Sequence, residues 1–362
     1  MGSSEDLRKL RKKIDDLDND ILTLLNKRAE VALGIREHKK ENFVGVYDPK
    51  REKEIEKKLR QLNSGPLSDD SILSVYREII SACRALQYPL RVSYLGPEGS
   101  FTHQAAYNEF GGSAELVPAG SFDEIFDEVE TGRASVGVVP VENSSEGSVG
   151  TVLDLLSASS LTVSAEIFEK INHFLLSKSD KLSGVKVVAS HPQALAQSKK
   201  WISKKLPDAK IRETSSTAEA ARLASRSKDI GAVAGLHSAS IYKLNILGKN
   251  IADSKRNTTR FFVIGRHMSP PSGDDRTSIV FSLKDKPGEL QKVFFQPFAD
   301  AGVNLTKIES RPSKENPWEY LFFVDFKGHR DEKLIEKLLA KLAASSIYLK
   351  VLGSYPVGDS KR

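Results

Sequence analysis

The stretch RVSYLGPEGSFTHQ, residues 91–104, separates two kinds of sequence along the chain. It starts with a short apolar strand pattern over 91–95, passes through a turn rich in Gly and Pro, and opens a helix near Phe101. Before it, residues 5–88 are highly charged, nearly free of Gly, and predict helices almost throughout. After it, short apolar strands such as 136–139 alternate with helical stretches, which predicts an α/β fold.

The bulk composition predicts a globular chain of two or three domains. Its 362 residues exceed one ordinary domain, and 39% are hydrophobic and 28% charged. The only cysteine, Cys83, excludes an internal disulfide and disfavours a cysteine-based metal site. The net charge of +6 is spread along the chain, which disfavours nucleic acid as a partner and suits small anionic substrates. The polar start lacks a signal-peptide pattern, and nothing spans a bilayer, so we expect a cytoplasmic protein with no membrane partner.

An apolar seam predicts a long first helix, ending near residue 40 and packed on partners. Its 3-4 spacing is kept by Leu7, Leu10, Ile14, Leu17, Ile21, Leu24, Val31 and Ile35. Asp48 and Pro49 predict the start of a second helix, as its cap and its first residue. A third helix is expected from about Ser68 until Pro89 closes the segment.

Arg28 occupies a seam position where the pattern predicts an apolar residue. A buried guanidinium is costly unless an anion meets it, so Arg28 either binds an anionic ligand or is a snorkelling or internally paired arginine. Lys39 returns to within about 20° of the same helix face, about 16 Å further along. Arg11 lies about 42 Å from Lys39 along a continuous helix, so only an antiparallel partner helix can bring both to one small ligand.

The helical segment resembles the all-helical chorismate mutases fused to the front of many bacterial enzymes of phenylalanine synthesis. The catalytic residues implied by the resemblance are Arg11 of a partner chain, Arg28, Lys39, Asp48, Arg51, Glu52 and Gln87. The arginines would bind two carboxylates, Lys39 and Gln87 the ether oxygen, and the two acidic residues the hydroxyl. The rearrangement needs only a compact substrate and stabilisation of charge on that oxygen. Taken singly, Asp48 also fits a helix cap, and Arg51 with Glu52 a solvated ion pair.

Four motifs of the middle segment together resemble prephenate dehydratase over residues 91–266. They are YLGPEGSFTHQ at 94–104, VPVENS at 139–144, SHPQ at 190–193 and NTTRF at 257–261. The resemblance implies a two-lobed domain akin to periplasmic binding proteins. A repeated pattern agrees with two lobes, because a Ser-capped helix precedes a strand both at 121–139 and at 216–233.

The implied reaction removes the ring hydroxyl of prephenate as water while carbon dioxide leaves, without cofactor, metal or nucleotide. Thr259 is the implied catalytic hydroxyl, and as a weak acid it is expected to donate a hydrogen bond to the departing oxygen. The implied substrate-binding residues are Asn143, Ser190, Gln197 and Arg260. Ser190 also fits a cap of the helix that follows Pro192.

The last segment follows a linker at 267–276 and has the strand order βαββαβ of a ferredoxin-like domain. Its motifs DKPGEL at 285–290 and NLTKIESRP at 304–312 resemble the ACT domain. The resemblance implies feedback inhibition by phenylalanine bound between subunits. The implied effector-binding or coupling residues are Gly288, Leu290, Asn304, Leu305, Glu309 and Ser310.

We therefore expect a multidomain enzyme, a homodimer or higher homo-oligomer, that converts chorismate to prephenate and prephenate to phenylpyruvate. Its expected parts are a mutase at 1–88, a dehydratase at 89–266, the linker and an ACT domain at 277–362. A non-catalytic amino-acid sensor is the alternative from another class, but it gives no reason for Arg28 and Lys39 to share a helix face. A fused dehydrogenase is unsupported, because no strand is followed by G-x-G-x-x-G.

Overall fold

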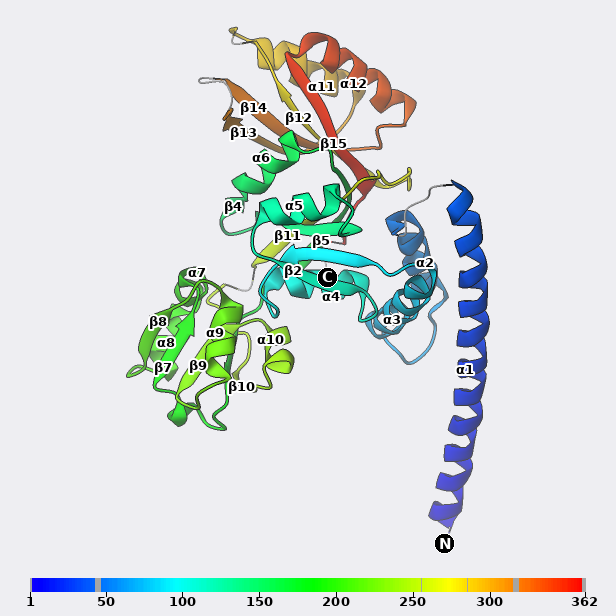
Figure 1. Ribbon diagram of the computed structural model, residues 1–362, viewed down its shortest axis with the longest axis vertical. Helices are drawn as coiled ribbons and strands as arrows, with labels where there is room; N and C mark the ends of the chain where they lie inside the picture. The colour runs from blue at the N-terminus through cyan, green and yellow to red at the C-terminus, as the bar shows by residue number, and fades with distance from the viewer. Residues whose placement is uncertain (1, 43–46, 255, 285, 315–318, 360–362) are drawn as a thin grey trace. The chain divides into compact units, whose positions relative to one another are not determined.

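The computed structural model describes residues 2–42, 47–254, 256–284, 286–314 and 319–359, with the backbone alone for 2–4 and 37–42. The chain divides into two compact units (Figure 1). The helical unit comprises Met1–Asp48, Ile55–Leu90 and Phe110–Glu115. The α/β unit comprises Pro49–Glu54, Arg91–Glu109 and Leu116–Arg362.

Three helices form the N-terminal part of the chain, as predicted. They are α1 Gly2–Asn42, α2 Pro49–Leu62 and α3 Asp69–Gln87. Ser68 caps α3, because its hydroxyl accepts a hydrogen bond from the Ser71 N–H at 3.2 Å. No helix among the described residues is both long and apolar enough to cross a membrane.

The face of α1 that is covered within the chain differs from the predicted seam. Helix α1 packs against α3, and its less exposed side chains are Leu25, Arg28, Ala29, Ala32 and Arg36. The seam residues are exposed instead, for example Leu17 at 60% and Leu24 at 64%. Arg28 belongs to both sets and therefore lies at the edge between the covered face and the exposed apolar face. The predicted seam is therefore not the face that α3 covers, and the exposed apolar stripe is left for another partner.

The first lobe of the α/β unit is a mixed sheet of strand order β2-β1-β3-β11-β5, with β4 beside β3. Its strands are β1 Arg91–Leu95, β2 Glu115–Ala119, β3 Val136–Asn143, β4 Gly147–Ser148, β5 Thr162–Lys170 and β11 Thr258–Gly265. Its helices are α4 Phe101–Phe110, α5 Phe122–Glu130 and α6 Gly150–Ala158. The expected α/β character and the strands at 91–95 and 136–139 are confirmed.

The second lobe is a sheet of order β10-β6-β9-β7-β8, and the chain crosses between the lobes after β5 and before β11. Its strands are β6 Phe174–Ser177, β7 Val187–Ser190, β8 Lys210–Glu213, β9 Ile230–Ala234 and β10 Asn245–Gly248. Its helices are η1 Leu182–Gly184, α7 Pro192–Gln197, α8 Lys199–Lys205, α9 Thr217–Ala224 and α10 Leu236–Ile241. The repeated pattern is confirmed, since Ser121 caps α5 in the first lobe and Ser216 caps α9 in the second.

The C-terminal domain is a four-stranded antiparallel sheet of order β13-β14-β12-β15, with its helices on one face (Figure 1). Its elements are β12 Asp275–Ser282, η2 Leu290–Phe295, α11 Gln296–Ala301, β13 Leu305–Pro312, β14 Tyr320–Lys327, α12 Lys333–Ser345 and β15 Tyr348–Pro356. The predicted ferredoxin-like order is confirmed. The helix expected over 287–301 is split into a π-helical turn and α11, where Pro297 lacks the N–H that a regular helix would use.

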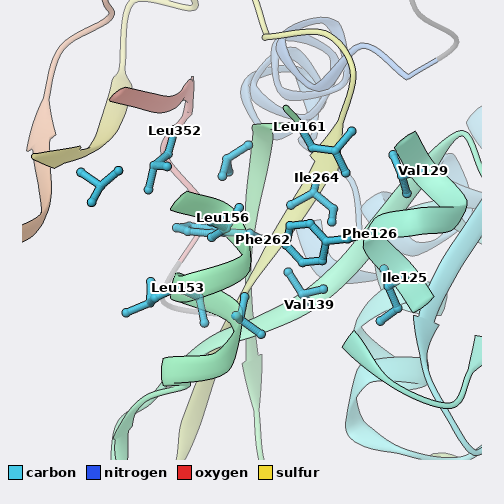
Figure 2. Packing of buried hydrophobic residues seen from close by; sticks show 14 of the residues in the cluster. Ile125, Phe126, Val129, Val139, Leu153, Leu156, Leu161, Phe262, Ile264 and Leu352 are labelled. Atoms are coloured by element: carbon cyan, nitrogen blue, oxygen red, sulfur yellow. The ribbon is translucent and has the colours of Figure 1, made fainter. Parts of the chain in front are cut away.

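Both faces of this C-terminal sheet are covered by apolar packing. Side chains alternate between the faces along a strand, so neighbouring residues join different cores. On β12, Ile279 and Phe281 join the core under the helices, whereas Val280 joins the core of the first lobe. Figure 2 shows Leu352 of β15 with Leu156 and Phe262 of that lobe, in the same cluster. The first lobe and the C-terminal domain therefore share one hydrophobic core.

Gly353 of β15 tests this shared core. A Cβ at Gly353 would lie 2.2 Å from the backbone oxygen of Val163 on β5, which cannot move without shifting the strand. We expect Gly353→Ala to destabilise the α/β unit by about 1–3 kcal/mol, seen as a lower melting temperature in a thermal scan. The matched control is Gly265→Ala, whose new Cβ would meet only Val136 at 3.6 Å. Equal melting temperatures for the two variants would contradict the packing.

Candidate active site

A hydrogen-bonded cluster of neutral side chains forms where β3 ends and β11 begins. The two strands are antiparallel, and Thr259 lies opposite Asn143. The Asn143 Nδ2 donates to Thr259 Oγ1 at 2.8 Å and to Asn257 Oδ1 at 2.8 Å. The Ser145 N–H donates to Asn143 Oδ1 at 2.9 Å, so both ends of the Asn143 carboxamide are fixed.

The same cluster continues into the second lobe. Gln197, the last residue of α7, accepts at Oε1 from Asn257 Nδ2 at 3.1 Å and from His173 Nε2 at 2.9 Å. His173 and Asn257 lie on the two chain crossings between the lobes. Together, Asn143, His173, Gln197, Asn257 and Thr259 form the dehydratase cluster, which joins both lobes and their connections.

The cluster is rich in hydrogen-bond donors and contains no charged side chain. Within the described residues, Thr259 makes one side-chain hydrogen bond, as the acceptor from Asn143, so its own proton remains for another acceptor. Burial lowers the pKa of His173, and the bond to Gln197 only partly opposes this, so His173 is neutral near pH 7. Gln197 Oε1 already accepts two hydrogen bonds, so Gln197 would bind a ligand by donating from its amide N–H groups.

Two predicted substrate-binding residues lie outside this cluster. Ser190 is fully buried, and its hydroxyl donates to the Val233 carbonyl at 2.6 Å, which ties β7 to β9. The Arg260 guanidinium is buried against Glu166 and Asp325 on the opposite face of β11 from Thr259. Neither side chain faces the cluster, and substrate binding by Ser190 and Arg260 stays a prediction.

Sequence reasoning singled out Asn143, Gln197 and Thr259, and the structure brings these three together. It missed His173, a lone histidine without a surrounding motif, and gave no role to Asn257, although that residue begins the NTTRF motif. It also missed Glu169, which lies opposite Thr259 on β5 and accepts from Asn108 Nδ2 at 3.1 Å and from the Gln104 side chain.

The predicted mutase residues lie in or beside the three N-terminal helices. Arg11 is exposed on α1, Arg28 is half-buried on the same helix, and half-buried Gln87 ends α3. Half-buried Asp48 directly precedes α2. These placements agree with the expected helices, and the catalytic roles stay predictions.

The other predicted mutase residues belong to the first turns of α2 and the end of α1. Arg51 is exposed, and its Nη1 donates to Glu54 Oε2 at 2.9 Å, so this surface ion pair uses Glu54. Glu52 is half-buried on α2. The Lys39 side chain lies outside the described residues.

Three of the six predicted effector residues lie at two places, Asn304 and Leu305 at a cavity of the C-terminal domain and Glu309 at a contact with the first lobe. Asn304 and Leu305 line a cavity of about 360 Å³ together with Phe295 and Phe298. Gly288 has a left-handed φ of 76° just before the π-helical turn that Leu290 begins.

The contact with the first lobe involves the second motif of this domain. Glu309 accepts a hydrogen bond from the Ser148 hydroxyl, and Lys307 Nζ lies 3.4 Å from Glu309 and 3.2 Å from Glu142. Ser310 is exposed on the other face of β13. Glu309 thus contacts Ser148 of β4, the short strand that follows Asn143 along the chain. Ser310 points to the other face of β13 and does not face the first lobe.

The GPEGSFTH loop docks on the second lobe through backbone carbonyls. Ser238 Oγ donates to Gly99 O at 2.8 Å, and Tyr242 Oη donates to Glu98 O at 2.8 Å. His103 supports this loop, because its Nδ1 accepts from the Gly99 N–H at 3.0 Å. Burial, and then the charge of neighbouring His237, lower the pKa of His103 to about 4.

This low pKa predicts an acid-sensitive fold. Unfolded His103 takes up its proton as the pH falls below its ordinary value of 6.5, whereas the folded form resists until about 4. The stability that neutral His103 contributes is therefore lost across that window. We expect the melting temperature to fall from pH 6.5 to 4, and His103→Gln to make the fall shallower while lowering the value at pH 7. The exposed His267→Gln variant should keep the wild-type slope, and a slope unchanged in His103→Gln would contradict the assignment.

Comparison with known proteins identifies all three parts of the chain. Family models match in order as Chorismate mutase type II over residues 10–88, Prephenate dehydratase over 92–269 and ACT domain over 277–344. The bifunctional chorismate mutase/prephenate dehydratase of Aquifex aeolicus (strain VF5) is 47% identical over 356 residues, covering 97% of this chain and 98% of the relative.

Solved structures match about three quarters of the chain. Prephenate dehydratase from Arthrobacter aurescens in complex with L-Phe matches with a TM-score of 0.69 and 31% identity, over 75% of this chain and 92% of that one. GqqA, described as a novel type of quorum quenching acylase, matches with a TM-score of 0.68 and 28% identity, over 74% of this chain and 98% of that one.

These findings favour an enzyme over the non-catalytic sensor, and they support phenylalanine as the effector. The match to the Aquifex relative runs through all three parts and nearly the full length of both chains. The chain belongs to the family of bifunctional chorismate mutase/prephenate dehydratases.

Proposed function

We propose that the dehydratase step of this enzyme takes place at the dehydratase cluster, with Thr259 donating a hydrogen bond to the departing ring hydroxyl of prephenate. The observation that carries the proposal is the 2.8 Å bond from Asn143 Nδ2 to Thr259 Oγ1. Because this bond uses the oxygen as an acceptor, the hydroxyl proton remains available to a ligand. A hydroxyl is a poor leaving group, so a donor fixed in advance stabilises the charge that develops on it.

Gln197 is proposed to bind a carboxylate of prephenate. Its Oε1 is held from two sides by His173 and Asn257, which turns the amide N–H groups away from both. An amide N–H is a good donor to a carboxylate oxygen and adds no charge that would hinder the loss of carbon dioxide. Asn143 is the positioning residue for Thr259 in this arrangement.

Replacing the hydroxyl isolates the role of Thr259. We expect Thr259→Val to lower the dehydratase kcat by about 10²–10³-fold, because the shape is kept and the donor is lost. The KM for prephenate should change little, since Gln197 is untouched. Thr259→Ser is the matched control and should retain most of the activity. Phenylpyruvate formation from prephenate gives both constants, and a kcat for the Val variant within threefold of wild type would refute the role.

For the mutase step we propose that Arg28, Lys39, Asp48, Arg51, Glu52 and Gln87 of one chain act with Arg11 of a second chain. Chorismate carries two carboxylates, and planar guanidinium groups bind carboxylates through paired hydrogen bonds. The half-buried place of Arg28, at the edge of the exposed apolar stripe, supports a site at a junction between chains.

A homodimer through α1 follows from the same stripe. Helix α1 has 41 residues and exposes Leu10, Ile14, Leu17 and Leu24 by more than half. A stripe with this spacing is the surface that a second helix covers in a coiled coil. An antiparallel copy of α1 would cover it and would bring Arg11 toward the Lys39 end of the partner helix.

Mixing two inactive chains tests this arrangement. Arg11→Ala and Arg28→Ala should each abolish the mutase step and leave prephenate turnover intact. If Arg11 acts across the dimer, unfolding and refolding the two variants together should restore about a quarter of the wild-type mutase rate, because half of the dimers are mixed and each mixed dimer holds one intact site of two. No recovery would show that Arg11 acts within its own chain, and loss of prephenate turnover in Arg28→Ala would assign Arg28 to the fold.

We propose that phenylalanine binds beside Asn304 and Leu305, whose cavity has aromatic residues in its lining, with Gly288 and Leu290 at the neighbouring turn. Glu309, through Ser148, is a proposed contact for transmitting the effect. We also propose the domain limits 1–88, 89–266 and 277–362. The proposed compartment is the cytoplasm.

A further inference from the structure

We propose that Arg260 is a positioning residue for Thr259 that the effector domain holds in place, and that it transmits the effector's inhibition to the dehydratase cluster. The inference rests on the proposed role of Thr259 and on the response to phenylalanine. It gives Arg260 a function different from the substrate binding that the sequence suggested.

The alternation of side chains along β11 places Thr259 and Arg260 on opposite faces of the sheet. Thr259 lies opposite Asn143 on β3 and Glu169 on β5, whereas Arg260 lies opposite Glu142 and Phe168. Consecutive residues of a strand are about 3.3 Å apart, so the backbone of Arg260 cannot move without moving Thr259.

Three nitrogens of the Arg260 guanidinium are each fixed by a separate partner. Nε donates to Glu166 Oε2 on β5 at 2.8 Å. Nη1 donates to Asp325 Oδ2 on β14 at 2.5 Å, and Nη2 donates to Tyr355 Oη on β15 at 3.0 Å. Two of the three partners therefore belong to the effector domain, and the side chain is only 6% exposed.

The effector-domain partners close a ring of hydrogen bonds. Ser278 Oγ donates its single proton to Asp325 Oδ1 at 2.6 Å, so the 2.5 Å contact between Ser278 and Tyr355 must be donated by the tyrosine. Tyr355 can do so because it accepts from Arg260. Arg260, Tyr355, Ser278 and Asp325 thus fix one another, and the ring spans β11, β12, β14 and β15.

The buried charges around the ring balance, and Glu142, whose Oε2 lies 3.8 Å from Arg260 Nη1, is itself paired with Lys307 at 3.2 Å. Arg260 and Arg276 face the two buried carboxylates of Glu166 and Asp325, and Arg276 Nη1 lies 2.5 Å from Glu166. Burial alone would raise the pKa of Asp325, but the facing Arg260 and the Ser278 hydroxyl outweigh it and hold that pKa below its ordinary value. Removing one member of a balanced buried set leaves an unpaired charge, so the arrangement tolerates little displacement of the effector sheet.

A second ion pair on the same interface provides the control. Asp154 on α6 pairs with Arg311 at 3.3 Å and with Lys314 at 2.8 Å, so it also joins the first lobe to the effector domain. Asp154 is not a neighbour of β11 in the sheet. If the Arg260 ring served only to hold the domains together, Asp154→Asn and Asp325→Asn would have the same effect.

The experiment compares these two isosteric variants in the full-length enzyme. We expect Asp325→Asn to lower the dehydratase kcat by about tenfold or more with the KM for prephenate within twofold, because misplacing a catalytic group lowers kcat. Phenylalanine should still bind in calorimetry but should inhibit several-fold less than in wild type. Asp154→Asn should match wild type in kcat and in inhibition, and both variants should keep the mutase rate.

Each contrary result has a definite meaning. Wild-type kcat and inhibition in Asp325→Asn, or equal losses in Asp154→Asn, would overturn the proposal. A wild-type enzyme that phenylalanine does not inhibit would refute the proposed regulation instead, and full activity in Thr259→Val would refute the proposed role of Thr259. If Asp325→Asn does not fold, Arg260→Lys replaces it, because lysine keeps the charge but cannot reach three partners at once. The same losses of kcat and inhibition are expected, and their absence would overturn the proposal.

Discussion

The Arg260 guanidinium and the two buried carboxylates beside it constrain how the dehydratase and effector domains can pack. None of the three groups can be taken out of water alone, and they come from β11, β5 and β14 of the two domains. The charged set therefore requires both domains to be in place. The shared apolar core around Phe262 and Leu352 supplies non-directional attraction, and the ion pairs fix the relative position of the sheets (Figure 2).

Polar contacts at the edge of this interface also fix the effector sheet to the first lobe. Lys350 of β15 donates to the carbonyls of Leu156 at 2.8 Å and Ser157 at 3.1 Å, where α6 ends. The last carbonyls of a helix lack partners within it and carry partial negative charge, so a lysine there satisfies both needs. Helix α6 is thus held at its last turn by β15 and at Asp154 by Arg311 of β13. Two strands of the effector sheet, β13 and β15, therefore contact α6 of the first lobe.

Much of this architecture could be predicted because it depends on local patterns. The Ser caps and the strand and helix order needed only spacing, whereas the grouping of Asn143, Gln197 and Thr259 was implied by the resemblance to prephenate dehydratase. Local patterns did not determine which side chains face one another. The seam of α1 predicted the helix but not which of its faces α3 covers, and the motif around Arg260 did not reveal that its side chain faces away from Thr259. The same rule that singled out Arg28, a charge where an apolar residue is expected, applies to Arg260 and Asp325, which interrupt buried strands.

The two reactions of this enzyme are favoured by opposite electrostatic surroundings. A rearrangement of a dianion is favoured by fixed cations, and the proposed mutase residues include Arg28 and Arg51. Elimination of hydroxide with loss of carbon dioxide needs donors that assist the leaving oxygen without holding the product carboxylate strongly. The neutral cluster around Thr259, which we propose as the site of this step, fits that need, since burial lowers the pKa of His173 and the Gln197 oxygen is already occupied as an acceptor. The Arg260 guanidinium is turned to the other face of its strand and is paired with carboxylates, so its charge does not face the cluster.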